Sequence, residues 1–374
     1  MITKFVIGFN FFIIFYVFAI NFVYFIQLIL AIFNLHEYIE KLKYSDYKNY
    51  IVSDNMIPIS ILVASYNEEN TIASNVSSIL ALQYPMFEVV VINDGSKDRS
   101  LEELIKNFDL VKINKPIHKR IETERVKAIY GSKTYTNLIV IDKENRGKAD
   151  ALNAGVNIAN YPIVASIDAD SILESDALVR VIMPFIEDRN TAAVGGIVRI
   201  ANGSKIVDGR VIDVNIPKNK LARFQIVEYL RAFLIGRVGW DAINSLLIIS
   251  GAFGVFRKDI LIKTGGYAHT IGEDMELVLK IHRYSLDNKL NLRVKFIPDP
   301  VCWTQAPENL KSLRTQRRRW QVGLMQSLFS YKDMLFKPRY KHIGIFMLPY
   351  YWIFEMIGPL IELLGYILIP VSYF

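Results

Sequence analysis

Long apolar stretches lie at both ends of the chain. Residues 5–35 contain no charged side chain, and aromatic and aliphatic residues dominate this stretch. About 20 apolar residues are enough for a helix to cross the hydrocarbon core of a bilayer, so we expect a transmembrane helix here. The stretch is too long for the apolar part of a signal peptide, and no cleavage site of small residues follows it.

A second apolar stretch covers residues 343–374. Its only charged residues are Glu355 and Glu362, and prolines interrupt it. We therefore expect one or more C-terminal transmembrane segments with breaks at the prolines. Because the sequence ends among apolar residues without a polar tail, we expect either that the natural chain continues or that another segment covers this end.

Basic residues indicate the orientation of the second stretch. Lys337, Arg339, Lys341 and His342 lie immediately before it. Cytosolic loops of membrane proteins carry an excess of lysine and arginine. We therefore expect a multi-pass protein of the cell membrane whose central domain lies in the cytosol.

Short apolar runs rich in β-branched residues alternate with helical patterns in the middle of the chain. Strands are predicted at 59–64, 88–92, 138–141 and 163–167, and helices at 69–82, 99–108 and 148–159. This alternation predicts an α/β fold with a mostly parallel sheet covered by helices on both faces. Ligands of such sheets bind beyond the carboxyl ends of the strands.

Polar residues collect where these strands end. Tyr66 and Glu68 follow the first strand, Asp94 follows the second, and Asp168 and Asp170 follow the strand at 163–167. No Gly-x-Gly-x-x-Gly fingerprint and no Walker loop follows the first strand. This absence disfavours a dinucleotide-binding or P-loop protein.

The two aspartates after the strand at 163–167 have the spacing of a cation site. Residues two apart on an extended chain point the same way, so Asp168 and Asp170 can reach one ion. Mg²⁺ and Mn²⁺ prefer oxygen ligands and often bridge to a diphosphate. The alternative is a solvated turn in which Asp170 caps the next helix.

Charged residues begin two predicted helices. Lys148, after Gly147, can meet a phosphate through its own charge and through the helix N-terminus, and an ordinary exposed lysine is the alternative. Glu273, Asp274 and Glu276 begin the other helix. The helix dipole favours carboxylates there, which is a sufficient structural reason, whereas a catalytic role would make one of them a general base.

An arginine-rich segment follows Pro307. Arg314, Arg317, Arg318 and Arg319 precede Trp320 on a predicted helix. A basic helix of this kind can rest on lipid headgroups. Arginines also bind diphosphates through paired hydrogen bonds, and an indole can stack on a sugar ring.

Composition supports a membrane protein. Hydrophobic residues make up 52% of the 374 residues, and the formal net charge is +7. In a membrane protein such an excess reflects lysine and arginine beside lipid headgroups, so we expect the bilayer, and no nucleic acid, as the partner. The only cysteine, Cys302, cannot form an internal disulfide or supply a cysteine cluster for a metal.

The order of these motifs resembles that of the processive family 2 glycosyltransferases, which include cellulose, hyaluronan, chitin and poly-N-acetylglucosamine synthases. The resemblance covers residues 58–329 and rests on four motifs in order: Asp94, Asp168-Ala169-Asp170, Gly272-Glu273-Asp274 and Gln316-Arg317-Arg318-Arg319-Trp320. Each motif is weak by itself. Their order between two membrane segments is specific.

This resemblance implies a domain organisation. A cytosolic GT-A domain, which is Rossmann-like with a mostly parallel sheet, would cover residues 56–300. Residues 301–342 would contain the Gln-x-x-Arg-Trp motif and amphipathic helices. The helices at the membrane surface would be 220–234 and 307–331.

The resemblance also implies roles for single residues. Asp274 matches the general base, with Glu273 beside it in the catalytic motif. Asp168 and Asp170 match the motif that binds Mg²⁺ or Mn²⁺. The residues implied in donor binding are Tyr66, Glu68, Asp94, Lys148, Asp168, Gln316, Arg319 and Trp320.

The reaction implied is an inverting transfer of a hexose or an N-acetylhexosamine from a UDP-sugar to the end of a growing polysaccharide. The alternative within the same class is transfer of one sugar to a lipid or oligosaccharide acceptor. A subunit that binds the donor without activity belongs to a different class. Many relatives have more transmembrane helices, so an accessory subunit or a homo-oligomer is a further expectation.

Overall fold

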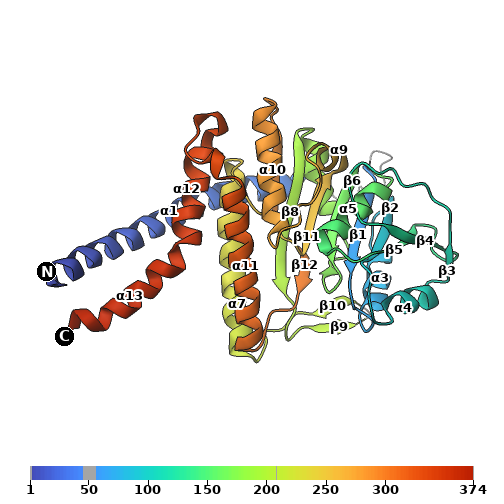
Figure 1. The fold of residues 1–374 in the computed structure, drawn as a ribbon, viewed down its shortest axis with the longest axis horizontal. Helices are drawn as coiled ribbons and strands as arrows, with labels where there is room; N and C mark the ends of the chain where they lie inside the picture. Colours follow the sequence, from blue (N-terminus) through green and yellow to red (C-terminus); the bar gives the residue numbers. More distant parts are fainter. Residues whose placement is uncertain (1, 45–55, 208, 374) are drawn as a thin grey trace.

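The computed structural model describes residues 2–44, 56–207 and 209–373 (Figure 1). Its centre is a ten-stranded mixed sheet with the strand order β3-β4-β5-β2-β1-β6-β11-β8-β12-β7. The strands are β1 (Ile59–Ser65), β2 (Phe87–Asn93), β3 (Leu110–Lys112), β4 (Val126–Ser132), β5 (Leu138–Lys143), β6 (Ile163–Asp168), β7 (Ile172–Leu173), β8 (Thr191–Ile200), β11 (Phe253–Arg257) and β12 (Arg293–Thr304). A separate hairpin consists of β9 (Lys205–Val207) and β10 (Arg210–Asp213).

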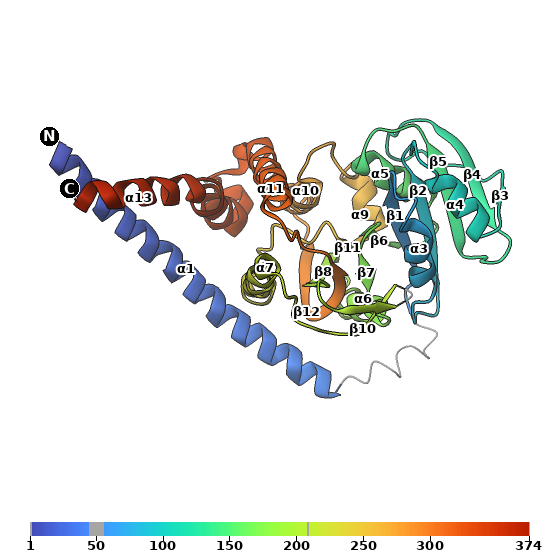
Figure 2. The same cartoon turned by 90° about the horizontal axis from the view of Figure 1, so that it is seen from below.

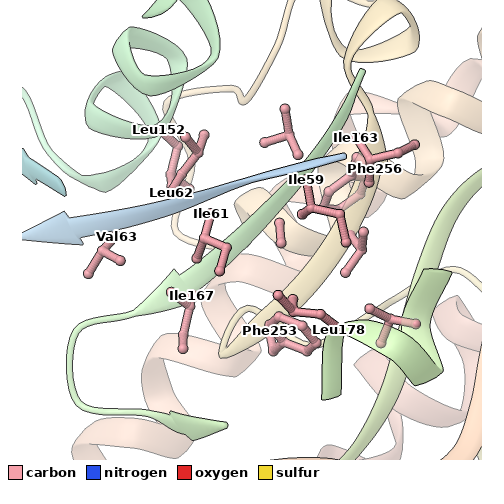
Figure 3. Packing of buried hydrophobic residues seen from close by; sticks show 14 of the residues in the cluster. Ile59, Ile61, Leu62, Val63, Leu152, Ile163, Ile167, Leu178, Phe253 and Phe256 are labelled. Carbon is pink, nitrogen blue, oxygen red and sulfur yellow. The ribbon is translucent and has the colours of Figure 1, made fainter. Parts of the chain in front are cut away.

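The part of the sheet that the sequence predicts consists of four neighbouring parallel strands, in the order β5, β2, β1 and β6. Their side chains are apolar on both faces because helices cover both. Figure 3 shows Leu62 of β1 next to Leu152 on one face, and Phe253 next to Leu178 on the other. These four residues are buried. The prediction of four parallel strands is confirmed, with strand ends moved by one or two residues.

Antiparallel strands extend this parallel centre on both sides. β4 and β3 continue the sheet beyond β5, and β11 joins β6 to β8. The segment 109–137, which has no clear periodicity in the sequence, contributes β3 and β4. It therefore forms one edge of the sheet.

Helices cover the sheet on both sides (Figure 2). They are α3 (Ile72–Leu80), α4 (Ser100–Asn107), α5 (Lys148–Ile158), α6 (Ala177–Glu187), α9 (Lys258–Lys263) and α10 (Glu273–Asp287). The predicted helices at 69–82, 99–108 and 148–159 correspond to α3, α4 and α5, and all three are confirmed.

The N-terminal helix α1 (Ile2–Tyr44) extends past the predicted transmembrane stretch and contains 43 residues. At 1.5 Å per residue it is about 65 Å long, more than one bilayer core requires. Its second half packs on the domain. Asn34 donates hydrogen bonds to the carbonyl of Val238 and to Asp241, and Tyr38 donates one to Asp299. The helix therefore connects the apolar end rigidly to the sheet.

The C-terminal region is a series of broken helices. It contains η4 (Ile343–Met347), α12 (Leu348–Tyr350), η5 (Tyr351–Met356) and α13 (Gly358–Tyr373), preceded by the short turns η2 (Lys332–Met334) and η3 (Pro338–Tyr340). Pro349 and Pro359 lie at two of the junctions, where the missing N–H interrupts regular hydrogen bonding. Phe374 lies outside the described residues.

Within the part of the chain that the structure describes, two segments are long and apolar enough to cross a membrane: Ile7–Lys43 and Ile343–Leu368. The first part of α1 lies beside α13, and the rest of α1 diverges from the second segment and runs along the domain (Figure 2). Tyr16 connects them by donating a hydrogen bond of 3.0 Å to the carbonyl of Ile353.

The two predicted surface helices lie between these segments and the sheet. They are α7 (Lys220–Leu230), which continues into η1 (Arg231–Arg237) and α8 (Val238–Ala242), and α11 (Leu310–Ser330). Figure 1 shows α7 and α11 running in the same direction in the view and transverse to α1 and α13. The Glu228 carboxylate and the Arg317 guanidinium form a paired contact between them. On α7, Phe224 and Val227 are exposed, as expected of a helix at a membrane surface.

Candidate active site

The carboxyl ends of three strands bring the predicted site residues to one edge of the sheet. Ala64 of β1 pairs with Asp168 of β6, and Ser65 pairs with Asn93 of β2. The amide of Asp94 donates a hydrogen bond of 2.9 Å to the carbonyl of Ser65. The expectation that polar residues meet at this edge is therefore confirmed.

Lys148 is the centre of the charged cluster. Its Nζ lies 2.6 Å from Asp168 Oδ1 and 3.1 Å from Glu273 Oε1, and it donates a hydrogen bond of 3.2 Å to the carbonyl of Gly251. Burial opposes the charge on Lys148, but Asp168 and Glu273 outweigh it and raise the pKa of the ammonium group. Lys148 is thus a fixed cation at the N-terminus of α5, where an anion is favoured.

Asp274 lies beside this cluster in a narrow pocket that it shares with Lys148, Glu273 and Gly251. An added Cβ on Gly251 would lie 3.3 Å from Asp274 Oδ2, which is a tight contact, and 3.6 Å from Lys148 Nζ, which is an ordinary one. Burial, and then the charge of Glu273, raise the pKa of Asp274. A carboxylate whose pKa moves toward neutrality is a stronger general base.

Asp170 faces other carboxylates at the end of β6. Burial, followed by the charge of Asp168, raises its pKa, and Glu68 contributes in the same direction. Asn75 of α3 holds the turn through a hydrogen bond to the carbonyl of Ala169. Two mutually repelling carboxylates fit a divalent cation, which would relieve the repulsion.

The residues present would not enclose a metal by themselves. Among residues 2–44, 56–207 and 209–373, no group of three or more His, Cys, Asp or Glu side chains could hold an ion. Mg²⁺ commonly binds through one or two carboxylates plus substrate phosphates. Asp168 and Asp170 fit a metal of this type, with the donor diphosphate as the remaining ligand.

The first strand end supplies Tyr66 and Glu68. Tyr66 is exposed, and Glu68 accepts a hydrogen bond of 2.8 Å from the hydroxyl of Thr71. Asn67 between them has a φ of 57°, a left-handed conformation that asparagine tolerates better than most residues. Both side chains are available at the sheet edge, and their contact with a nucleotide stays a prediction.

Asp94 is more enclosed than its predicted role in nucleotide binding implies. It is 3% exposed, and its carboxylate accepts hydrogen bonds from Lys143 Nζ (2.6 Å), Asn145 Nδ2 (3.1 Å) and the amides of Arg146 (3.2 Å) and Gly147 (2.7 Å). Asp94 thus fixes the loop that leads to Lys148. A direct contact with the nucleotide stays a prediction.

Lys143 is a site residue that sequence reasoning missed. Its side chain is fully buried, 2.6 Å from Asp94 and 3.6 Å from Asp150. Asp150 in turn accepts two hydrogen bonds from the amide of Glu124. A lysine at the end of a strand gives no signal in the sequence that distinguishes this position from an exposed one.

The helix α11, which contains the Gln-x-x-Arg-Trp motif, contacts the start of α10 through its later turns. Ser327 of α11 donates a hydrogen bond of 3.3 Å to the carbonyl of Gly272, and Gln326 accepts one of 3.0 Å from the amide of Ile271. The motif precedes these contacts by two to three helical turns, so it lies on the helix that braces Glu273 and Asp274.

The predicted residues of that motif differ in environment. Gln316 Oε1 is shielded from solvent and has no donor within the part of the chain that the structure describes. Arg319 is exposed. Trp320 is half-exposed, with its ring edge-on to Tyr229 at 6.4 Å between centres. Their roles in donor binding stay predictions.

Comparison with known sequences decides the family. The model described as "Glycosyltransferase like family 2" matches residues 57–323, which is more than half of the chain. The chain belongs to the family 2 glycosyltransferases. The resemblance to family 2 that the four motifs indicate is therefore confirmed.

Curated relatives of this family 2 glycosyltransferase are polysaccharide synthases. The poly-β-1,6-N-acetyl-D-glucosamine synthase of Staphylococcus aureus is 31% identical over 315 residues, which are 83% of this chain and 65% of that protein. The enzyme of the same name from Staphylococcus epidermidis is 33% identical over 270 residues, which are 71% of this chain and 54% of that protein. The chain thus spans less than two thirds of the length of these relatives.

A solved structure supports the predicted GT-A fold. The mannosyltransferase PcManGT from Pyrobaculum calidifontis, solved in complex with GDP-mannose and Mn²⁺, superimposes with a TM-score of 0.54. The match covers 89% of this chain and 85% of that chain at 19% sequence identity. At this identity the likeness shows the fold alone.

Proposed function

We propose that the chain is a membrane-bound inverting glycosyltransferase that extends a polysaccharide with N-acetylhexosamine from a UDP-sugar. The observation that carries this proposal is the cluster of Lys148, Asp168, Glu273 and Asp274 at one edge of the GT-A sheet. The two Staphylococcus synthases support the N-acetylglucosamine donor, which is one of the two sugar classes that the sequence predicts.

Asp274 is the general base in this proposal. It removes the proton from the acceptor hydroxyl while that oxygen attacks C1 of the donor sugar. The bond between C1 and the diphosphate oxygen breaks on the opposite face, so the anomeric configuration inverts and UDP leaves. The raised pKa of Asp274, caused first by burial and then by Glu273, favours its role as proton acceptor near neutral pH.

Lys148 stabilises the leaving group. Its ammonium is held in place by Asp168 and Glu273 before any substrate binds, so little reorganisation is needed when negative charge grows on the diphosphate. Asp168 and Asp170 would hold Mg²⁺ or Mn²⁺, which when bound supplies further charge to the same diphosphate. Arg319 is exposed and can add a bidentate contact.

The membrane is the second partner in the proposal. The spans Ile7–Lys43 and Ile343–Leu368 would anchor the enzyme, with α7 and α11 at the surface of the bilayer and the sheet in the cytosol. The lysines and arginines at 337–341 support this orientation. An accessory subunit or a second copy would complete the membrane part.

Purified protein in nanodiscs, incubated with a panel of UDP-sugars and Mn²⁺, tests the proposal. We expect UDP release with UDP-N-acetylglucosamine and a ladder of products. A product with one added sugar would instead assign the chain to the single-transfer class. Binding of UDP-sugar without any release, with acceptor and lipid present, would contradict the catalytic proposal.

A further inference from the structure

The second membrane segment contains two carboxylates with different surroundings. Glu355 of η5 is partly buried and accepts a hydrogen bond of 2.8 Å from the hydroxyl of Tyr350. Glu362 of α13 is exposed, and within residues 2–44, 56–207 and 209–373 it has neither an ion-pair partner nor a hydrogen-bond donor. The chain therefore supplies a partner for Glu355 but none for Glu362.

Apolar side chains surround Glu362 on the exposed part of α13. Its neighbours Leu360, Leu363 and Tyr366 are each more than half exposed. Glu362 is also the only charged residue in the sequence of α13. Side chains such as leucine suit the lipid tails of a bilayer, whereas a carboxylate among them is costly. Glu362 thus interrupts a surface that would otherwise fit lipid.

Contacts between the two membrane segments give the level of Glu362 along α1. A Cβ added to Gly358 of α13 would lie 3.1 Å from Tyr16 Oη. One added to Gly365, two turns later, would lie 3.8 Å from Ile13. The two helices are therefore antiparallel here, and Glu362 lies level with the turn of α1 at 13–16.

This turn lies in the middle of the apolar part of α1. Lys4 is the nearest charged residue before it in the sequence. Tyr24 after it marks the level of the surface helices, because Arg231 of η1 stacks on its ring at 4.8 Å. At 1.5 Å per residue the turn is about 15 Å from either position, and a hydrocarbon core is about 30 Å thick. In the proposed orientation Glu362 thus lies near the centre of the bilayer.

A carboxylate at this depth calls for a positively charged partner. Charged residues inside membranes are rare, and they almost always face other helices or a watery cavity and pair there. Residues 5–35 contain no charged residue, and Glu355 and Glu362 are the only ones in 343–374. A second copy of these segments therefore has no lysine or arginine to offer. The complementary charge belongs to a different membrane helix.

We propose that Glu362 marks the face of α13 on which a transmembrane helix of an accessory subunit docks, with a lysine or arginine near the middle of that helix paired to the carboxylate. The inference rests on the membrane part of the proposed function. It gives the expected accessory subunit a docking surface and a charge. Leu360, Leu363 and Tyr366 would pack against the apolar side chains that flank the cation.

A model transmembrane peptide tests this docking surface. The probe is a polyleucine helix with one lysine at its centre and a dansyl group at one end, and the matched probe has leucine in place of the lysine. The purified chain and the peptide are mixed in vesicles of phosphatidylcholine, whose headgroup carries no net charge. Energy transfer to the dansyl group is measured from the tryptophans, of which Trp352 lies in the second membrane segment.

We expect the lysine peptide to bind the wild type more tightly than the leucine peptide. Half-saturation should occur at a peptide-to-lipid ratio about five- to thirtyfold lower, the range for a polar contact between membrane helices. Glu362→Gln should lose this preference, because it keeps the shape of the side chain without the charge. Leu360→Ala is the matched control, since it changes the same exposed surface and keeps the carboxylate.

An exchange of charges extends the test. Glu362→Lys should prefer a peptide with a central glutamate over the lysine peptide. The uncharged Glu362→Gln keeps the test valid if Glu362→Lys does not enter the bilayer. Equal binding of both peptides to the wild type, or an unchanged preference in Glu362→Gln, would overturn the inference. So would self-association of the wild type that Glu362→Gln abolishes, because it would assign this face to a second copy.

UDP release in the same vesicles separates this inference from the proposed function, since peptide binding requires no turnover. Release from a UDP-sugar without a preference for the lysine peptide would leave the enzyme proposal intact and overturn the docking surface. A preference for the lysine peptide that depends on Glu362, without release from any UDP-sugar, would support the docking surface and contradict the enzyme proposal.

Discussion

Gly272 and Gly323 bring the backbones of α10 and α11 into direct contact. A Cβ added to Gly272 would lie 2.7 Å from the carbonyl oxygen of Gly323, and one added to Gly323 would lie 2.8 Å from the backbone of Gly272. Both distances are too short for any side chain. Gly272 is the glycine of the Gly-Glu-Asp motif. Because it has no side chain, α11, which contains the Gln-x-x-Arg-Trp motif, can pack directly against the backbone just before Glu273 and Asp274.

The first prediction concerns this contact. Gly323→Ala should force α11 away from the start of α10, because neither backbone can yield without moving its helix. We expect at least a tenfold fall in kcat and a loss of stability of about 1–3 kcal/mol, the usual range for overpacking. Gly365→Ala is the control, since its nearest atom would lie at an ordinary 3.8 Å. Wild-type kinetics and unfolding in Gly323→Ala would contradict the prediction.

The second prediction concerns the general base. Asp274→Asn keeps the shape of the side chain but cannot accept the proton, so kcat should fall by about 10²–10⁴. UDP affinity, measured by calorimetry, should change little because Lys148 and Asp168 remain. Glu102→Gln, on the exposed side of α4, is the control. A parallel loss of UDP affinity would show that Asp274 supports the structure of the donor site instead.

The third prediction concerns the metal. A chelator should stop transfer, and Mn²⁺ or Mg²⁺ should restore it, because two mutually repelling carboxylates, Asp168 and Asp170, need a bound cation to meet the diphosphate. Asp170→Asn should require a higher metal concentration for half-maximal activity. Metal-dependent quenching of protein fluorescence in the presence of UDP provides a readout other than turnover. Full activity in the chelator would refute the assignment.

The sequence predicts the parallel centre of the sheet because those strands are buried on both faces. Ile61, Leu62 and Val63 are all fully buried, which produces an unbroken apolar run. β12 gives no such signal, because Pro298 and Pro300 lie within it and prolines argue against a strand. Its pairing with β8 shifts register there. Residues 293–304 therefore form a strand because of their tertiary contacts with β8, and not because of their local β propensity.

The residues of the candidate site likewise fall into those that the sequence predicts and those that it does not. Asp168, Lys148 and Asp274 could be predicted because their chemistry and order along the chain are informative. Lys143 could not, because its importance arises from what surrounds it after folding. A buried charge and an exposed charge look alike in a sequence when no periodic pattern marks the position.

The fourth prediction concerns the buried network under the loop before Lys148. Lys143→Met removes the cation that Asp94 and Asp150 share, leaving two carboxylates uncompensated in the interior. Breaking a buried ion pair in this way typically costs about 3–5 kcal/mol. We expect a large fall in the temperature of unfolding, measured in detergent, and Lys127→Met on the exposed face of β4 is the control. Equal stability of both variants would show that the network is dispensable.

The last prediction is a dependence of stability on pH through His282. This side chain is buried on α10, and its Nε2 lies 2.8 Å from the carbonyl of Leu246, which it can reach only as a donor. Burial lowers the pKa of His282 from 6.5 to about 4. Between these two values the unfolded chain binds a proton that the folded chain does not, so the free energy of unfolding falls as the pH falls.

The contribution is fully present above pH 6.5 and is lost progressively as the pH drops toward 4. The difference between the pKa values of His282 in the unfolded and the folded chain corresponds to roughly 3 kcal/mol in the free energy of unfolding. His282→Gln retains an N–H donor for the Leu246 carbonyl but does not titrate, so the variant should lose less stability between pH 7 and pH 5 than the wild type. His118→Gln, at an exposed position, should behave as the wild type. The measurement is thermal unfolding at each pH. If the wild type and His282→Gln lose the same stability as the pH falls, His282 does not cause the acid sensitivity, and the buried carboxylates become the next candidates.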